Sequence, residues 1–254
     1  MTILLIGRGK VIKNLFRKTV FVHHMLRLSN LYQSIHIVQQ ELVLNEDDRC
    51  LLLAPHPDDE SIGCGGLLLK YPDNFELICL TDGRHSDTIT PKHELISTRK
   101  NEFETAMSKL GIYRYSFLQV EDRHLMSHYN VFSSIDIENY DYIFLPGFLD
   151  QQPDHKAVTF LLQKLLKERK YKSSLKIAFY EVWTSLALPN FYVDITENIE
   201  KKRDLISTHQ SQIKSANYDE RIIALNKYRG MPVNREYAEA FSIVGATTFL
   251  KLFN

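Results

Sequence analysis

The stretch that decides the fold runs from Cys50 to Glu60 and reads CLLLAPHPDDE. Its first five residues form a short, continuous apolar run, which is typical of a strand buried on both faces of a parallel sheet. The polar residues His56 to Glu60 follow at once and would therefore lie at the carboxyl end of that strand. Open α/β sheets bind their ligands at this edge, so we expect chemistry here.

Three more apolar runs repeat the pattern, at 75–80 (FELICL), 142–145 (YIFL) and 177–182 (IAFYEV). Helical patterns lie between them. One helical pattern has apolar residues from Leu95 to Leu110 and stops at Gly111, and glycine is a common residue just after the C-terminus of a helix. Another helical pattern covers 157–166. Strands that alternate with helices predict an α/β domain with a mostly parallel sheet and flanking helices.

Composition excludes several protein classes. The 254 residues are 44% hydrophobic and 24% charged, which is ordinary for a globular protein. Lysine plus arginine and aspartate plus glutamate both number 31, and this zero net charge argues against a dedicated nucleic-acid binder.

The three cysteines lack the spacing of a structural zinc site or a disulfide framework, which favours a cytoplasmic location. Cys50 and Cys79 lie in apolar runs and are expected to be buried thiols. We find no apolar run of about 18 residues and no signal-peptide cleavage pattern, so neither a spanning helix nor a signal peptide is expected.

The N-terminal segment differs in composition from the rest of the chain. Six basic residues and no acid precede Glu41, and apolar residues are interspersed at roughly helical spacing. We therefore divide the chain into an N-terminal basic extension, 1–45, and a main domain, 46–254. Two interpretations stay open: an arm whose apolar side packs on the main domain, which we favour, or a basic amphipathic segment in peripheral contact with the inner face of an anionic membrane or with a partner.

Two polar segments supply candidate metal ligands. One is HPDDE at 56–60, and the other is DQQPDH at 150–155, shortly after the third apolar run. His56, Asp59 and His155 would give two imidazoles and one carboxylate, a common set for catalytic zinc. Asp58 would then remain free to accept a proton from an activated water. The alternatives are a hydrogen-bonded loop histidine and a simple acidic cluster at a helix N-terminus.

Glycines at 63, 65 and 66 follow closely. A phosphate-binding loop is one interpretation, but the segment has neither the P-loop lysine nor the G-x-G-x-x-G spacing. Close packing of a helix on the sheet is the interpretation we favour.

The run APHPDDE at 54–60, followed by GCGG at 63–66, strongly resembles the opening motif of the LmbE/PIG-L family of zinc-dependent N-deacetylases. Further segments resemble later parts of that family in the expected order, over roughly 49–245: TDG at 81–83, RKNEFETAMSKLG at 99–111, PDHKA at 153–157, YEVW at 180–183, VDIT at 193–196, HQSQ at 209–212 and AEAF at 238–241.

This resemblance implies a Rossmann-like α/β fold and hydrolysis of an N-acetyl group, usually on an amino sugar. It implies that His56, Asp59 and His155 bind zinc, that Asp58 is the general base, and that Asp154 orients a neighbouring catalytic group. The expected partner is a small N-acetyl sugar or its conjugate.

One position departs from the family pattern. The second motif of the family usually begins with a histidine, regarded as a general acid or oxyanion stabiliser, and this chain has Gln152 there. Glutamine can donate a hydrogen bond but cannot supply a proton. Asp58 would then transfer both protons, His209 or His85 would supply the acid, or the enzyme would be slow on ordinary amides.

Substrate contacts are expected from Arg99, His209 and Trp183. Arg99 would hold a hydroxyl or phosphate, or alternatively pair with Glu102 on a helix surface. The function expected is zinc-dependent deacetylation of an amino sugar. The alternatives are a zinc hydrolase of a non-sugar amide and a catalytically weakened zinc-binding protein.

Overall fold

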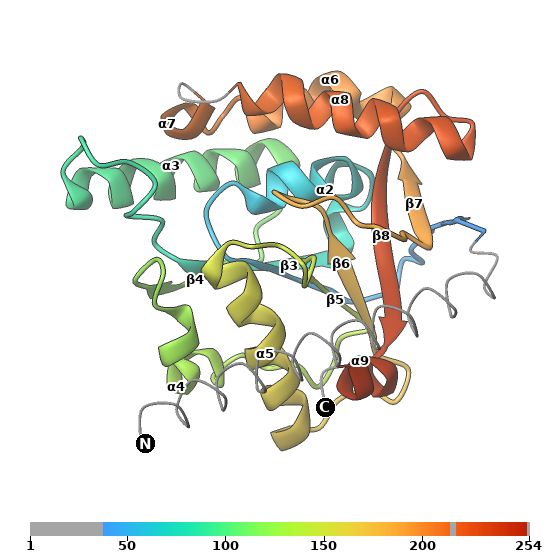
Figure 1. The fold of residues 1–254 in the computed structure, drawn as a ribbon, viewed down its shortest axis with the longest axis horizontal. Helices are drawn as coiled ribbons and strands as arrows, with labels where there is room; N and C mark the ends of the chain where they lie inside the picture. The colour runs from blue at the N-terminus through green and yellow to red at the C-terminus, as the bar shows by residue number, and fades with distance from the viewer. Residues whose placement is uncertain (1–37, 214–216, 253–254) are drawn as a thin grey trace, which may run out of the picture. The chain divides into compact units, whose positions relative to one another are not determined.

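The structure, a computed structural model, describes residues 38–213 and 217–252. Its centre is an eight-stranded sheet (Figure 1). In spatial order the strands are β1 (Gln40–Glu41), β7 (Phe191–Asp194), β8 (Ala238–Gly245), β6 (Lys176–Tyr180), β5 (Tyr142–Pro146), β2 (Cys50–Ala54), β3 (Phe75–Thr81) and β4 (Tyr115–Val120). Only β8 runs antiparallel to its neighbours, so the expected mostly parallel α/β sheet is confirmed.

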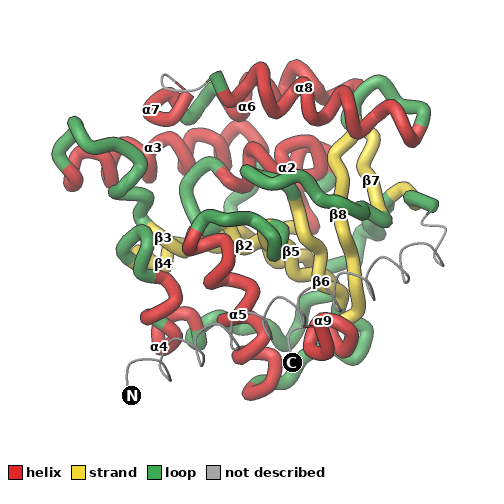
Figure 2. The backbone as a smooth tube through the Cα atoms, viewed as in Figure 1, coloured by secondary structure: helices red, strands yellow, loops and turns green. Residues whose placement is uncertain are grey.

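Helices cover both faces of the sheet (Figures 1 and 2). One face carries α2 (Asp59–Lys70), α3 (Lys92–Leu110), α6 (Ile199–Ile206), α7 (Gln210–Ile213) and α8 (Tyr218–Gly230). The other carries α4 (Tyr129–Phe132), α5 (Pro153–Glu168) and α9 (Ala246–Leu252). Short 3₁₀ helices lie at Pro72–Asn74, Leu125–Ser127, Thr196–Asn198 and Met231–Val233.

Strand β2 shows why its sequence is continuously apolar. Leu52 and Ala54 pack into the core beneath α2 and α3, whereas Leu51 and Leu53 pack into the core beneath α5 and α9. Successive side chains of a strand point to opposite faces, so a strand covered on both sides needs apolar residues at every position. Cys50 and Cys79 are buried as expected.

The predicted elements correspond closely to the observed ones. Helix α3 ends at Gly111, whose φ of 71° is the left-handed C-terminal conformation. The strand predicted at 177–182 ends two residues earlier than expected, at Tyr180. The next residue, Glu181, is outside the strand, and its carboxylate accepts a hydrogen bond from Arg229 Nε at 3.1 Å. Strands β1, β4, β7 and β8 were not predicted.

The order of the strands explains where the site lies. From β2 the chain continues to β3 and β4 on one side, and then returns to β5 and β6 on the other. The parallel neighbours β2 and β5 therefore form a topological switch point, where a crevice opens at the carboxyl ends of the strands.

The predicted boundary between the N-terminal extension and the main domain can be compared with the structure only from residue 38 onward. Gln40 and Glu41 belong to the segment that we assigned to the extension, yet they pair with β7. Residues 1–37 lie outside the described residues, so the division at 45/46 stays a prediction. Within 38–213 and 217–252, no helix has the length and apolar character needed to cross a bilayer.

The glycines of α2 serve close packing, as expected. A Cβ at Gly66 would collide with the Ile195 side chain, and one at Gly63 would collide with the Tyr180 ring. Helix α2 thus approaches its neighbours at a distance that only glycine permits.

We predict that Gly66→Ala lowers the free energy of unfolding by about 1–3 kcal/mol, because the added methyl group overpacks the contact with Ile195. Urea denaturation measures the change. Gly245→Ala is the control, since a Cβ there meets nothing within 4 Å. Equal stability of the two variants would contradict the packing argument.

Candidate metal centre

The candidate ligands lie at the first turns of two helices. His56 is in the turn between β2 and α2, Asp59 begins α2, and His155 is in the first turn of α5, which follows β5. The pairing of β2 with β5 brings these segments together although 99 residues separate His56 from His155. The sequence prediction that two strand ends would join these residues is therefore matched by the fold.

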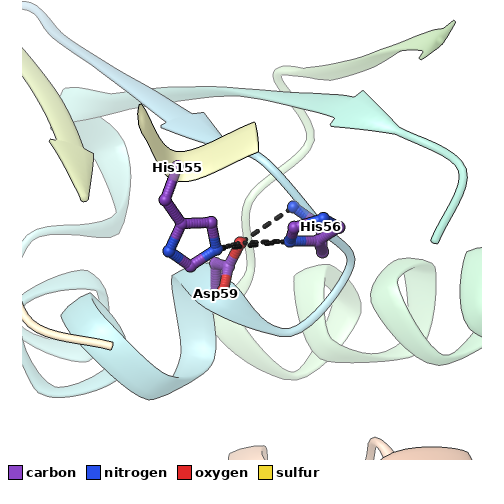
Figure 3. Close-up of side chains that lie close together, drawn as sticks. All are labelled: His56, Asp59 and His155. Carbon is purple, nitrogen blue, oxygen red and sulfur yellow. Dashed lines mark hydrogen bonds and ion pairs between the residues drawn. The ribbon is translucent and has the colours of Figure 1, made fainter. Parts of the chain in front are cut away.

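The three side chains converge on one point (Figure 3). Asp59 Oδ2 lies 3.2 Å from His56 Nδ1 and 3.2 Å from His155 Nε2. The two imidazole nitrogens are 3.3 Å apart. His155 and Asp59 are fully buried and His56 is 7% exposed, so the polar triangle is largely shielded from water.

This triangle fits a zinc-like ion. Zinc–nitrogen and zinc–oxygen bonds of about 2.0–2.2 Å in a tetrahedron imply ligand separations of roughly 3.3–3.6 Å, and the observed separations lie near the lower end of this range. The second oxygen of Asp59, Oδ1, is buried and has no hydrogen-bond partner. Buried polar atoms are rarely left unpaired, so this oxygen is an independent sign that a cation belongs here.

Carboxylates behind the imidazoles orient them. His56 Nε2 lies 3.2 Å from Asp154 Oδ2 and 3.3 Å from Asp122 Oδ1, and His155 Nδ1 lies 3.2 Å from Asp150 Oδ2. Such contacts fix which imidazole nitrogen faces the metal. Asp154 thus lies where it can orient His56, in line with the role that the resemblance implied.

His56, Asp122 and Asp154 form a second group with metal-ligand spacing. Both of its carboxylates accept backbone amides: Asp154 Oδ2 accepts from Arg123 at 2.6 Å, and Asp122 Oδ2 accepts from His85 at 3.0 Å. Of the two groups, only the first triangle contains a buried carboxylate oxygen without a hydrogen-bond partner, Asp59 Oδ1, so the first triangle is the better candidate for the metal and the second group can orient His56.

The metal-free electrostatics favour protonated histidines. Burial by itself lowers the pKa of His155, but the Asp59 and Asp150 carboxylates outweigh it and raise the pKa to about 9. The pKa of His56 is also raised, because contacts with Asp122, Asp154 and Asp59 outweigh burial. A cation in the triangle replaces those protons, so metal binding releases protons and weakens on acidification.

Asp58 lies beside the triangle and is held by Arg99. Its carboxylate is 3.2 Å from Arg99 Nη2, and its φ of 146° is a strained conformation for a residue with a side chain. Burial raises the pKa of Asp58 to about 6, against the lowering effect of Arg99. The arrangement can hold a proton acceptor next to the metal position.

Arg99 lies deeper than the sequence suggested. It is 2% exposed, and it donates to the carbonyl oxygens of Gly83 at 3.0 Å and Pro57 at 2.8 Å. It also lines the central pocket, so a substrate contact stays a prediction. Glu102, the alternative partner, accepts from Ser211 instead.

Gln152 has two roles in the structure. Its side-chain oxygen caps α5 by accepting from the amides of Asp154 and His155, at 2.5 and 3.0 Å. This capping bond turns the amide nitrogen toward His56 Nε2, at 2.9 Å. Gln152 also lines the pocket, so its amide lies beside His56 at the cavity wall.

Two predicted substrate contacts differ in position. Trp183 lines the pocket, is 45% exposed and packs on Tyr218 with ring centroids 4.9 Å apart. His209 is 1% exposed and lies behind Asp58, with Nε2 3.2 Å from Glu60 and 3.1 Å from Ser61. It is not among the residues that line the pocket.

Sequence reasoning missed Asp122, Asp150, Tyr218 and Gln212. Asp122 follows β4, a strand that was not predicted, and Asp150 was part of a quoted motif but received no role. Gln212 belongs to the HQSQ segment, which offered a signal that we did not use.

Comparison with known proteins supports the same family. The family model described as PIG-L: GlcNAc-PI de-N-acetylase matches residues 51–166. The diacetylchitobiose deacetylase of Thermococcus kodakarensis is 26% identical over 79% of this chain and 84% of its own length. A 1D-myo-inositol 2-acetamido-2-deoxy-alpha-D-glucopyranoside deacetylase of Nocardioides is 32% identical over 28% of each chain.

Solved structures agree on the architecture. The N,N'-diacetylchitobiose deacetylase of Pyrococcus horikoshii, in complex with an inhibitor, has a TM-score of 0.70 and 25% identity, covering 80% of this chain and 85% of that one. GalB, the 4-carboxy-2-hydroxymuconate hydratase of Pseudomonas putida, has a TM-score of 0.61 at 17% identity, covering 78% of this chain and 96% of its own, and this likeness concerns the fold alone.

The family match spans both polar segments of the triangle, from β2 through α5, and one relative and one solved structure extend the likeness over most of the chain. The resemblance noted in the sequence is confirmed over residues 51–166, which match the PIG-L family model.

Proposed function

We propose that this protein is a zinc-dependent hydrolase that removes the N-acetyl group of an N-acetylated amino sugar or its conjugate. One observation carries the proposal: the triangle of His56, Asp59 and His155 lies beside Asp58, a carboxylate outside the triangle that Arg99 holds in place. Relatives with deacetylase activity support the choice of bond.

His56, Asp59 and His155 are the proposed zinc ligands. When bound there, zinc supplies a Lewis acid and lowers the pKa of a coordinated water. The chain's own residues perform the other steps.

Asp58 is the proposed general base. It accepts a proton from the attacking water, and Arg99 keeps its carboxylate oriented during that transfer. The Gln152 amide, which lies beside His56 and lines the pocket, donates to the developing oxyanion.

Trp183 is the proposed sugar contact. Its half-exposed ring offers an apolar face to a pyranose, and the Asp150 carboxylate accepts from its backbone amide at 3.0 Å. The cavity of about 240 Å³ also holds Arg99 and Gln212, which supply polar contacts for ring hydroxyls.

Two alternative functions are separable by experiment. A hydrolase of non-sugar amides would release carboxylate from simple amides but not from N-acetyl sugars. A weakened zinc-binding protein would bind the sugar without releasing acetate. Measuring acetate from free, nucleotide-linked and lipid-linked N-acetyl sugars distinguishes all three.

Zinc content tests the ligands. We predict about one zinc per chain in the wild type and only traces in His155→Ala, because two remaining ligands hold zinc weakly. Elemental analysis gives the result. His93→Ala, on an 83% exposed side chain outside the site, should keep the metal. Full occupancy of His155→Ala would exclude His155 as a ligand.

Turnover tests the base. Asp58→Asn should keep zinc and fold but lose most of kcat, since asparagine cannot accept the proton. The acetate assay at saturating sugar measures this loss. Near-wild-type kcat would assign the base to another group.

Peripheral membrane contact is a proposal from composition alone, because most of the basic segment lies outside the described residues. It predicts that the full chain sediments with anionic vesicles at low salt and is released at high salt, since each basic residue contributes about 1 kcal/mol that salt screens. A variant lacking residues 1–37 is the control. Full-length protein that stays in the supernatant at low salt would end this proposal.

A further inference from the structure

The proposed reaction needs a proton donor for the leaving amine. The family's usual histidine is replaced by Gln152, whose side-chain oxygen caps α5 and whose amide N–H groups donate hydrogen bonds but are too weakly acidic to transfer a proton. General acid assistance is worth about 10²- to 10⁴-fold in rate, so the identity of the donor matters.

The residues lining the pocket restrict the choice. Beyond the triangle and Asp58, its ionisable residues are His85, Asp122, Tyr218 and two arginines. Arginine does not give up its proton. Asp122 acts as an acceptor, both toward the His85 amide and toward His56.

His209, the other histidine considered from the sequence, is a poor candidate. It is 1% exposed, its Nε2 faces Glu60 and Ser61, and it does not line the pocket. Substrate would have no direct path to its imidazole.

His85 lines the pocket that Asp58 also lines. Its backbone amide binds Asp122 Oδ2 at 3.0 Å, and the other oxygen of that carboxylate is 3.3 Å from His56 Nε2. One carboxylate thus connects the His85 backbone to a proposed zinc ligand. The His85 side chain is 21% exposed and reaches the same cavity as Asp58.

A second carboxylate faces the imidazole itself. Glu121 Oε1 lies 3.2 Å from His85 Nε2, and this contact lowers the pKa of Glu121. A carboxylate that pairs with an imidazole can orient it, as in the acid–base histidines of hydrolases.

Other charged groups surround this pair. Arg84 Nη1 lies 3.4 Å from Glu121 Oε2, and His124 Nδ1 lies 3.9 Å from Glu121 Oε1. Arg123 donates to the His85 carbonyl oxygen at 3.1 Å. Glu121 is therefore shared, and its partners contribute to the pH response of the site.

We propose that His85 is the general acid of this site. As the carbon–nitrogen bond of the tetrahedral intermediate breaks, its electron pair goes to nitrogen, and the imidazolium of His85 transfers its proton there. The products are the free amine and acetic acid. Asp58 then returns the proton taken from water to solvent, and His85 regains one from solvent, so the enzyme is unchanged.

This proposal rests on the proposed deacetylase function, and the experiment keeps the two separate. The substrate is the N-acetyl sugar that the wild-type zinc enzyme deacetylates fastest. The rate of acetate release from this sugar is measured as a function of pH. Absence of acetate from the wild type with every sugar overturns the proposed function and this inference together.

His85→Gln should lower kcat by about 10²- to 10⁴-fold, with zinc content and melting temperature unchanged. The decline of kcat at alkaline pH, where the wild-type acid loses its proton, should be missing in this variant. Glu121→Gln should lower kcat less than His85→Gln, because it removes only the carboxylate that faces the imidazole. His93→Gln is the control for removing an exposed histidine.

Three results would overturn the assignment while leaving the deacetylase function intact. One is a kcat of His85→Gln within a few-fold of the wild type. The second is a reduced kcat with the alkaline decline retained, which indicates a structural role. The third is loss of that decline in Tyr218→Phe but not in His85→Gln, which assigns the acid to Tyr218.

Discussion

The parallel pairing of β2 with β5 is the constraint on which the site depends. It sets the first turns of α2 and α5 side by side, and each turn carries part of the triangle. The glycines of α2 let this helix lie close to Tyr180 and Ile195, so the position of Asp59 follows from backbone packing and not from its side chain alone. Chemistry at this edge is a consequence of how the sheet is wound.

The excess of buried carboxylates at the site favours the binding of a cation there. Five carboxylates of the site are at most 4% exposed: Asp58, Asp59, Asp122, Asp150 and Asp154. Backbone amides satisfy several of their oxygens, and Arg99 offsets one charge. Burial of ionised carboxylates is costly without compensation, so either the histidines take up protons or a dication takes their place.

Much of this could be predicted from the sequence because the decisive residues are local. The fully apolar β2 and the polar turn after it are contiguous, and hydrophobic periodicity identified α3 and α5. The misses are of a different kind. Strand β4 lies at the edge and is only partly buried, so its pattern is weak, and with it Asp122 was overlooked.

Burial of single side chains was also beyond sequence reasoning. Arg99 and His209 are polar residues in helical or loop patterns, and nothing local shows that tertiary packing encloses them. The dual role of Gln152 likewise depends on α5 beginning next to His56, a relation set by the sheet and not by neighbouring residues.

The Asp150 carboxylate joins the proposed metal ligand His155 to the loop that carries Trp183. Its Oδ2 lies 3.2 Å from His155 Nδ1 and accepts the backbone amide of Trp183 at 3.0 Å. The loop proposed to contact sugar and the side chain proposed to hold metal thus share one oxygen atom. On this proposal Asp150 links the two affinities, and such a coupling is reciprocal: whatever factor the ion contributes to sugar affinity, the sugar returns to the affinity for the ion.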